Sequence, residues 1–231
     1  MLQSISQSII CISKKVINLA NNKNLEQLRK TVVERLGEHR AKHVLSTENE
    51  AALIAAEFLP EKEEKVRISA LLHDITKEYD YKKQLQIIFD FGIIIDNVKL
   101  HSSKVLHSIT AALLIPEEFP EFADDEIISA VEKHTTGSRD MTLFDTILYL
   151  ADYIEPLRKF DDCKKLREYF WCGIKNASNQ NEKLLHLYKT MIMSFDFTIE
   201  NLLKEQSVIA EETFEARNAF ILKCSVVAEE E

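Results

Sequence analysis

The chain has 231 residues, of which 45% are hydrophobic, so it can bury a full core as one large domain or two small ones. Only four Gly and four Pro occur between long stretches rich in Leu, Ile, Ala, Glu and Lys, which favours a mostly helical protein. The formal net charge of -9 argues against binding to long nucleic acid, which needs a basic surface, but permits a small anionic substrate in a locally cationic site.

The N-terminal apolar stretch places its lysines after the apolar residues, the wrong order for a signal peptide. No segment approaches the roughly 18 uninterrupted apolar residues of a transmembrane helix. The four cysteines show no CxxC spacing, which predicts free thiols in a reducing compartment. We therefore expect a cytoplasmic protein without membrane contact.

The first predicted helix carries an isoleucine-rich stripe. Its apolar residues follow steps of four and three, namely Ile5, Ile9, Ile12, Val16 and Leu19. Such a stripe either packs on its own domain or forms a seam with a partner helix or second subunit. A homodimer is therefore one of two outcomes that the sequence leaves open.

Two more helices are predicted before the middle of the chain. One covers about 38–59 and is ended by Pro60, and the next carries "LLHDITK", with an apolar face that includes Ile75. After a charged run, a helix reaches about Phe91 with Gly92 as its cap, and "GIIIDNVKL" is expected to be a connection.

The second half of the chain predicts further helices with recognisable ends. They are "KVLHSITAALLI", capped by Ser102 or Ser103 and terminated by Pro116; "DEIISAVEKH", capped by Asp124 and stopping at "TTG"; "TLFDTILYLADYIEP", ending at Pro156; and 164–177 and 181–204, joined by the polar loop "KNASNQN". The last residues, "CSVVAEEE", are expected to fray.

Polar residues interrupt these apolar helical segments. Four of the seven histidines have apolar neighbours, and two aspartates accompany them: His43, His73, His107, His134, Asp74 and Asp152. Taken alone, each is more often a hydrogen-bonded core residue, and Asp152 could simply pair with Arg158. Together they form a nitrogen and oxygen ligand set without thiolate, which suits iron, manganese, zinc or cobalt rather than calcium. Six such ligands can hold two metals if one carboxylate bridges them.

The order of these residues resembles the HD-domain phosphohydrolases, an all-α family. The segments "RAKHV", "LLHDITK", "LHSITAALL", "VEKHTTGSRDMT" and "YLADYIEPLR" are similar to the YqeK-like branch, the HD-domain symmetrical bis(5'-nucleosyl)-tetraphosphatases. The resemblance implies an HD-domain helical bundle over 35–217, an N-terminal helical extension over 1–34 and a C-terminal tail over 218–231. This chain departs from the family pattern at Ile75 and at "KFDDCK", and its "YFWCGIKNASNQN" region is longer than usual.

The resemblance also implies a ligand set and a substrate. One metal would be held by His43, His73, Asp74 and Asp152, and a second by His107 and His134 with Asp74 bridging. Iron is the first expectation, with manganese, zinc and cobalt as alternatives. The implied reaction is symmetrical cleavage of diadenosine tetraphosphate or a related dinucleoside polyphosphate to two ADP by a water bound between the metals.

Several residues near these ligands are candidates for substrate contact. Lys77 follows Asp74 by three residues and could reach a phosphate during catalysis, although it could also be a solvated lysine. The other candidates are Thr135, Thr136 and Gly137, where the alternative is a helix cap, and Arg139 and Arg158 as phosphate clamps, where Arg158 could instead orient Asp152 or Glu155.

Three competing interpretations remain open from the sequence. The first is an HD phosphohydrolase for another nucleotide, such as a nucleoside monophosphate or a guanosine alarmone. The second is a non-catalytic, metal- and nucleotide-binding regulatory module. The third is a purely structural bundle whose His and Asp residues satisfy one another.

Overall fold

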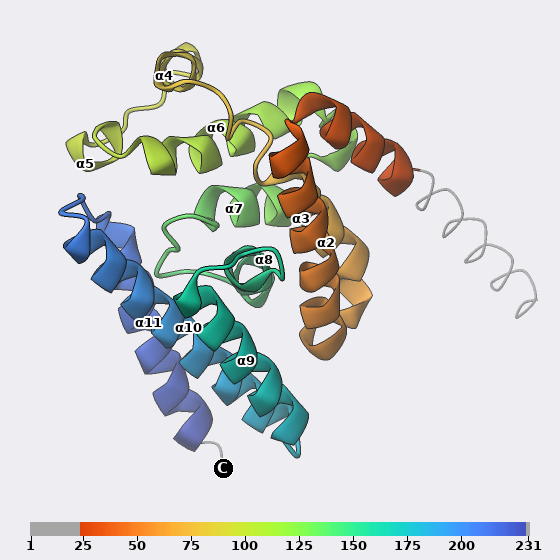
Figure 1. Cartoon of the computed structure of the whole chain (residues 1–231), viewed down its shortest axis with the longest axis vertical. Coiled ribbons are helices and arrows are strands. Elements are labelled where there is room, and N and C mark those ends of the chain that lie inside the picture. The colour runs from red at the N-terminus through yellow and green to blue at the C-terminus, as the bar shows by residue number, and fades with distance from the viewer. Residues whose placement is uncertain (1–23, 230–231) are drawn as a thin grey trace, which may run out of the picture.

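The computed structural model describes residues 24–229, and these residues form helices joined by short connections, with no β-strand among them (Figure 1). The all-α fold predicted from composition is therefore confirmed for the described part of the chain. The isoleucine-rich stripe of residues 5–19 lies outside it. No helix of the described residues is long and apolar enough to span a membrane.

Residues 24–35 are helical, and the chain then continues through ten labelled α-helices and two short 3-10 turns. The α-helices are α2 (Glu38–Phe58), α3 (Glu63–Leu72), α4 (Tyr81–Asp90), α5 (Asn97–Leu100), α6 (Ser103–Glu118), α7 (Asp125–Lys133), α8 (Leu143–Ile154), α9 (Asp161–Asn176), α10 (Gln180–Lys204) and α11 (Glu211–Glu229). The 3-10 turns are Pro60–Lys62 and Pro120–Phe122.

The apolar helix α8 lies at the centre of the bundle. It packs against α2, α3 and α7 on one side and against α9 and α10 on the other (Figure 1). The helices α9 and α11 both pack on α10 and form a layer with it. The largest fully buried aromatic side chains join the two sides: Phe144, Phe170, Phe195 and Phe220. Each such ring removes a large apolar area from water and so stabilises the bundle.

The helical segment 24–35, which belongs to the predicted extension, packs onto this bundle. Leu25, Leu28 and Val32 are buried in the same core cluster, at the spacing of one helical face. Arg29 binds the buried carboxylate of Glu48 on α2 through Nε at 2.9 Å.

Several helix ends occur where the sequence predicted them. α2 stops at Phe58, just before Pro60, and Gly92 follows α4 with a left-handed φ of 66°. Asp124 caps α7 by accepting a hydrogen bond from the Glu126 backbone N–H at 3.1 Å. α8 begins at a reciprocal capping box between Thr142 and Asp145, which ties down the start of the helix that carries Asp152.

Other boundaries differ from the prediction. Pro116 does not end α6, which continues to Glu118, because a proline in the last turn removes one N–H while the Phe119 N–H still bonds the Ile115 carbonyl. The loop after α9 is confined to residues 177–179, since Asn179 caps α10 early. The segment predicted as a tail is helical through Glu229, and Phe220 within it packs against the Phe195 ring.

The segment "LLHDITK" is not a continuous helix as the sequence predicted, and this difference affects the site because the segment carries His73 and Asp74. α3 ends at Leu72, and residues 73–78 form successive turns with bonds such as the Lys77 N–H to the Asp74 carbonyl at 3.0 Å. The predicted helix is therefore too long, although Ile75 is buried as expected.

Candidate metal centre

The structure brings together all six residues predicted as metal ligands. They come from five helices: His43 from α2, His73 and Asp74 from the end of α3, His107 from α6, His134 from the end of α7 and Asp152 from α8. Asp74 lies in the middle of the group. Its Oδ2 is 3.4 Å from His73 Nε2 and 3.6 Å from His43 Nε2, and its Oδ1 is 3.2 Å from His107 Nε2 and 3.8 Å from His134 Nε2. The two carboxylate oxygens thus face different pairs of imidazoles.

The histidine rings are held so that Nε2 points into the group. The Nδ1 atoms of His73 and His134 each donate to a backbone carbonyl three residues earlier at 2.6 Å. His43 Nδ1 lies 3.1 Å from Oε1 of Glu155, a fully buried carboxylate whose other oxygen accepts the Leu157 backbone N–H. A second hydrogen bond of this kind fixes the tautomer and orientation of a metal-ligating imidazole.

The arrangement fits a metal better than a self-satisfied polar cluster. His43 Nε2 and His73 Nε2 are buried without a hydrogen-bond partner, although Asp152 Oδ1 lies 2.9 Å from the former. Buried polar atoms are normally paired. Two sets of three donors, namely His43, His73 and Asp152, and His73, Asp74 and His134, each have their ligand atoms within 4.8 Å of one another. The donor set therefore suits divalent metal ions.

The protonation states of the cluster are set by competition between burial and charge. Burial raises the pKa of the Asp74 carboxyl, but His73, His107 and His134 outweigh it and hold the pKa well below its ordinary value. Burial lowers the pKa of His107 to about 3, so this imidazole is neutral, as a metal ligand must be. For His43, burial is outweighed by Asp152 and Glu155, which raise its pKa to about 9. A metal that binds His43 must displace this proton.

Two arginines neutralise the acidic ligands. Arg40 Nη1 lies 2.6 Å from Asp74 Oδ2, and Arg158 Nη2 lies 2.6 Å from Asp152 Oδ1. Arg158 was predicted either to clamp a phosphate or to orient Asp152 or Glu155, and the structure shows its ion pair with Asp152. Sequence reasoning missed Arg40 and did not connect Glu155 with His43. The available signal for Arg40 was its place three residues before His43 on one helix face.

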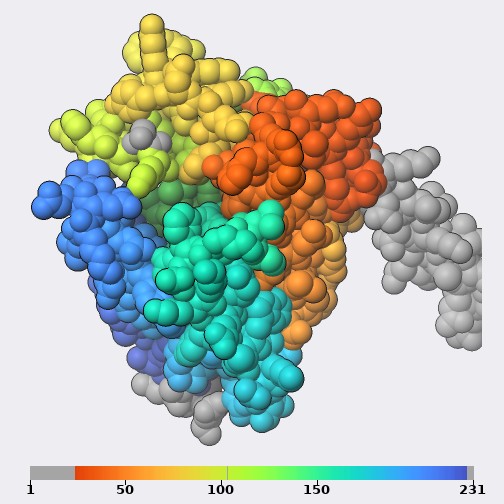
Figure 2. Space-filling view, in the orientation of Figure 1, coloured from red at the N-terminus to blue at the C-terminus, as the bar shows by residue number. Residues whose placement is uncertain are grey.

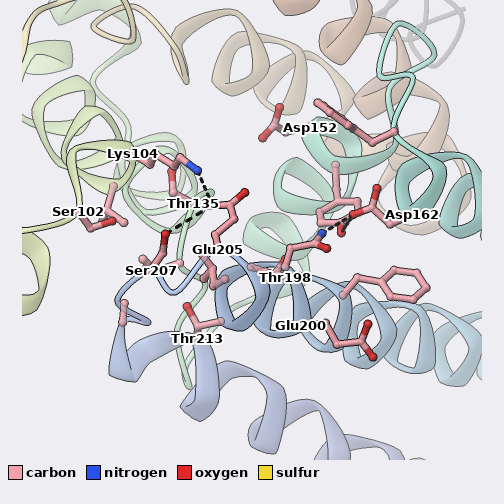
Figure 3. A pocket seen from close by; sticks show the side chains of 18 of the residues that line it. Ser102, Lys104, Thr135, Asp152, Asp162, Thr198, Glu200, Glu205, Ser207 and Thr213 are labelled. Atoms are coloured by element: carbon pink, nitrogen blue, oxygen red, sulfur yellow. Dashed lines mark hydrogen bonds and ion pairs between the residues drawn. The ribbon is translucent and has the colours of Figure 1, made fainter.

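A cavity of about 1280 Å³ opens beside the cluster. Figure 2 shows this face of the molecule hollowed between α6, the start of α9 and the α10–α11 pair. His107, His134 and Asp152 form part of its lining, and the predicted contacts Lys77, Thr135, Thr136 and Arg158 line it as well; Figure 3 shows several lining residues at close range.

Lys77 and Thr135 lie next to the histidines. Lys77 Nζ is 3.1 Å from His107 Nε2, and burial lowers the pKa of its ammonium group. Thr135 Oγ1 is 3.3 Å from His134 Nε2 and 3.4 Å from His107 Nε2. Thr136 is buried, and its hydroxyl bonds the Gly137 carbonyl at 3.0 Å.

Two predicted substrate contacts are not brought to the cavity lining. Gly137 lies four residues beyond the end of α7 with a left-handed φ of 69°, and a Cβ there would lie 2.7 Å from Phe195 Cζ and 2.9 Å from Ala216 Cβ. Its glycine is therefore required by packing against α10 and α11. Arg139 has a side chain that is 74% exposed and pairs with Glu215 at 3.6 Å.

Comparisons with known proteins agree with this geometry. The chain is 28% identical over 188 residues to the symmetrical bis(5'-nucleosyl)-tetraphosphatase of Halalkalibacterium halodurans, covering 81% of this chain and 92% of that protein. The protein of the same name from Bacillus subtilis is 28% identical over 194 residues, covering 83% and 94%. A crystal structure of a predicted HD superfamily hydrolase involved in NAD metabolism from Clostridium acetobutylicum superimposes with a TM-score of 0.73 at 30% identity, covering 86% of this chain and 97% of that one.

The HD domain model matches residues 40–157, a range that includes all six clustered His and Asp residues. Residues 40–157 run from Arg40, which binds Asp74, to the residue before Arg158, which binds Asp152. With the fold, the cluster and this match in agreement, the chain belongs to the HD domain family.

Proposed function

We propose that this protein is a metal-dependent hydrolase that cleaves diadenosine tetraphosphate symmetrically to two ADP. The observation that carries the proposal is Asp74: its two oxygens face separate pairs of imidazoles beside a cavity lined by Lys77 and Arg158. The relatives named as symmetrical bis(5'-nucleosyl)-tetraphosphatases support the substrate, because the match covers nearly their whole length.

The centre holds two metal ions in this proposal. His43, His73, Asp74 and Asp152 would hold one, and His107 and His134 would hold the other together with Asp74. A bridging role for Asp74 is supported because each of its carboxylate oxygens faces a different pair of histidines. Iron is the proposed metal, with manganese, zinc and cobalt as alternatives that an imidazole and carboxylate site also accepts.

When bound, such a pair of ions activates water and withdraws charge from a phosphoryl group. The oxygen of water forms a bond to one of the two central phosphorus atoms, and the bond from this atom to the oxygen bridging the central phosphates breaks, so each half leaves as ADP. Lys77 is placed to neutralise charge on the transferred phosphate from its position beside His107. Arg158 holds Asp152 and adds positive charge to the same wall.

The decisive test is the product profile of metal-assayed, full-length protein incubated with diadenosine tetraphosphate and resolved by ion-exchange chromatography. ADP as sole product, with about two metals per chain, supports the proposal. ATP with AMP would contradict symmetrical cleavage. Turnover of only nucleoside monophosphates or a guanosine alarmone would favour the other HD chemistry, and nucleotide binding without turnover would favour a regulatory module.

We also propose, from sequence alone, a cytoplasmic location and a homodimer that uses the isoleucine-rich stripe of residues 5–19. Light scattering coupled to size exclusion should give twice the chain mass for the full-length protein. An Ile9→Asp variant should give the monomer mass if the stripe forms the seam, and a monomeric full-length protein would remove the dimer.

A further inference from the structure

The large cavity has a second chemical character away from the metal cluster. One part of its wall, near α6 and the start of α11, is polar and is crossed by the Lys104–Glu205 ion pair at 2.9 Å. Another part is built from Phe160, Asp162 and Asn201, with Tyr153 behind them. Figure 3 shows Lys104 and Asp162 on opposite sides of the view, with Asp152 between them.

Phe160 presents an apolar surface to solvent. Its side chain is 70% exposed although it lines the cavity, and it lies two residues after Arg158, which binds the Asp152 ligand. An exposed aromatic ring is unfavourable in water, and stacking a purine base on it is favourable because the apolar faces of both rings are removed from water. Phe160 thus offers an exposed aromatic surface in the wall of the cavity that Asp152 also lines.

Asp162, on the first turn of α9, lines the same cavity and is held by several hydrogen bonds. Its Oδ2 accepts hydrogen bonds from Tyr153 Oη at 3.0 Å and Asn201 Nδ2 at 2.9 Å, and its Oδ1 accepts the Cys163 backbone N–H at 2.8 Å. An ionised carboxylate offers about four acceptor positions, and the fourth is taken by the Cys163 thiol, a weak donor that a ribose hydroxyl can replace. A carboxylate in this situation is suited to the hydroxyl groups of a ribose.

From these observations we infer that Phe160 and Asp162 form a nucleoside subsite, in which a purine stacks on Phe160 and one ribose hydroxyl donates to Asp162. This inference rests on the proposed function and adds which part of the cavity binds one nucleoside of the substrate. The start of α9 therefore distinguishes nucleotides from simple polyphosphates, while the metals and Lys77 act on the phosphates.

The ring is tested with Phe160→Ala against the matched control Phe89→Ala, which removes a 78% exposed phenylalanine from α4, outside the cavity lining. Dissociation constants for ADP and pyrophosphate are measured by titration calorimetry with metal-loaded protein. Phe160→Ala should weaken ADP by roughly tenfold or more, the usual value of one stacked base, and leave pyrophosphate unchanged because it has no base. KM for diadenosine tetraphosphate should rise with kcat retained, and Phe89→Ala should resemble the unsubstituted protein.

The carboxylate is tested without any substitution by comparing ADP with 2',3'-dideoxy-ADP. The unsubstituted protein should bind the dideoxy compound roughly tenfold more weakly than ADP. In Asp162→Asn the two compounds should bind with nearly equal affinity. The subsite is overturned if Phe160→Ala weakens the binding of ADP and pyrophosphate equally. It is also overturned if ADP and its dideoxy analogue bind the unsubstituted protein equally well, or if ADP does not bind. If diadenosine tetraphosphate is not hydrolysed but ADP binds in the expected pattern, the proposed function fails and the subsite stands.

Discussion

At the residue scale, Asp74 is the proposed ligand whose two oxygens face different pairs of histidines, and Lys77 is a nearby cation with a separate proposed role. Asp74→Ala should lose metal and activity together, because it removes both oxygens that face the imidazoles. Lys77→Ala should keep the metal content and reduce kcat by about 10²- to 10³-fold, a usual effect of removing one charge-stabilising group. Metal analysis alongside steady-state kinetics separates the two results.

The control for Lys77 is Arg139→Ala, which removes an exposed cation that is not part of the cavity lining. We expect its kinetics to match those of the unsubstituted protein. A Lys77→Ala variant with normal turnover would remove this lysine from the mechanism, and loss of activity in Arg139→Ala would restore Arg139 as a phosphate clamp.

Glu155 offers a subtler prediction, because it touches the centre only through His43. Glu155→Gln keeps the size of the side chain but removes the charge that orients the imidazole. Metal affinity should fall by about 10- to 100-fold, the usual effect of changing such a supporting residue. Competition with a chromogenic chelator measures this without relying on turnover, and an unchanged affinity would show that His43 is oriented by packing alone.

At the element scale, two ligands occupy the same position in their helices. His73 and His134 are the C-terminal caps of α3 and α7, and each ring bonds a carbonyl of its own last turn, at Ala70 and Val131. These carbonyls would otherwise lack a partner inside the helix. The same hydrogen bond therefore caps the C-terminus of the helix and orients the imidazole so that Nε2 points into the cluster.

Gly137, just beyond α7, allows a test of packing at the same scale. Gly137→Ala should lower the free energy of unfolding by about 2 to 4 kcal/mol, because the added Cβ meets Phe195 and Ala216 and φ is left-handed. Gly92→Ala is the matched control, since its φ is also left-handed but no atom lies within 4 Å of the added Cβ. It should cost about 1 to 2 kcal/mol. Urea denaturation measures both, and equal losses would show that packing is not what requires Gly137.

At the scale of the whole molecule, the six clustered His and Asp residues belong to five helices from separate parts of the chain. Metal binding should therefore stabilise the entire bundle. At a metal concentration 100 times the Kd, the gain is about 2.7 kcal/mol, and chelation should lower Tm by about 5 to 10 °C. Calorimetry with and without a chelator measures the change. Asp74→Ala should melt at one temperature in both conditions, and an unsubstituted protein insensitive to chelation would contradict a metal shared among the helices.

The sequence by itself determined the helical class, most helix positions and the set of six His and Asp residues that cluster in the structure. Helical periodicity and caps such as Asp124 are local properties, and a buried His or Asp is conspicuous among apolar neighbours. Only the tertiary structure decided which oxygen of Asp74 faces which histidine, that Arg40 and Glu155 support the centre, that Gly137 serves packing, and that Phe160 and Asp162 share a cavity with the metal ligands. Those relations join residues far apart in the chain, and no local pattern encodes the distance between two helices.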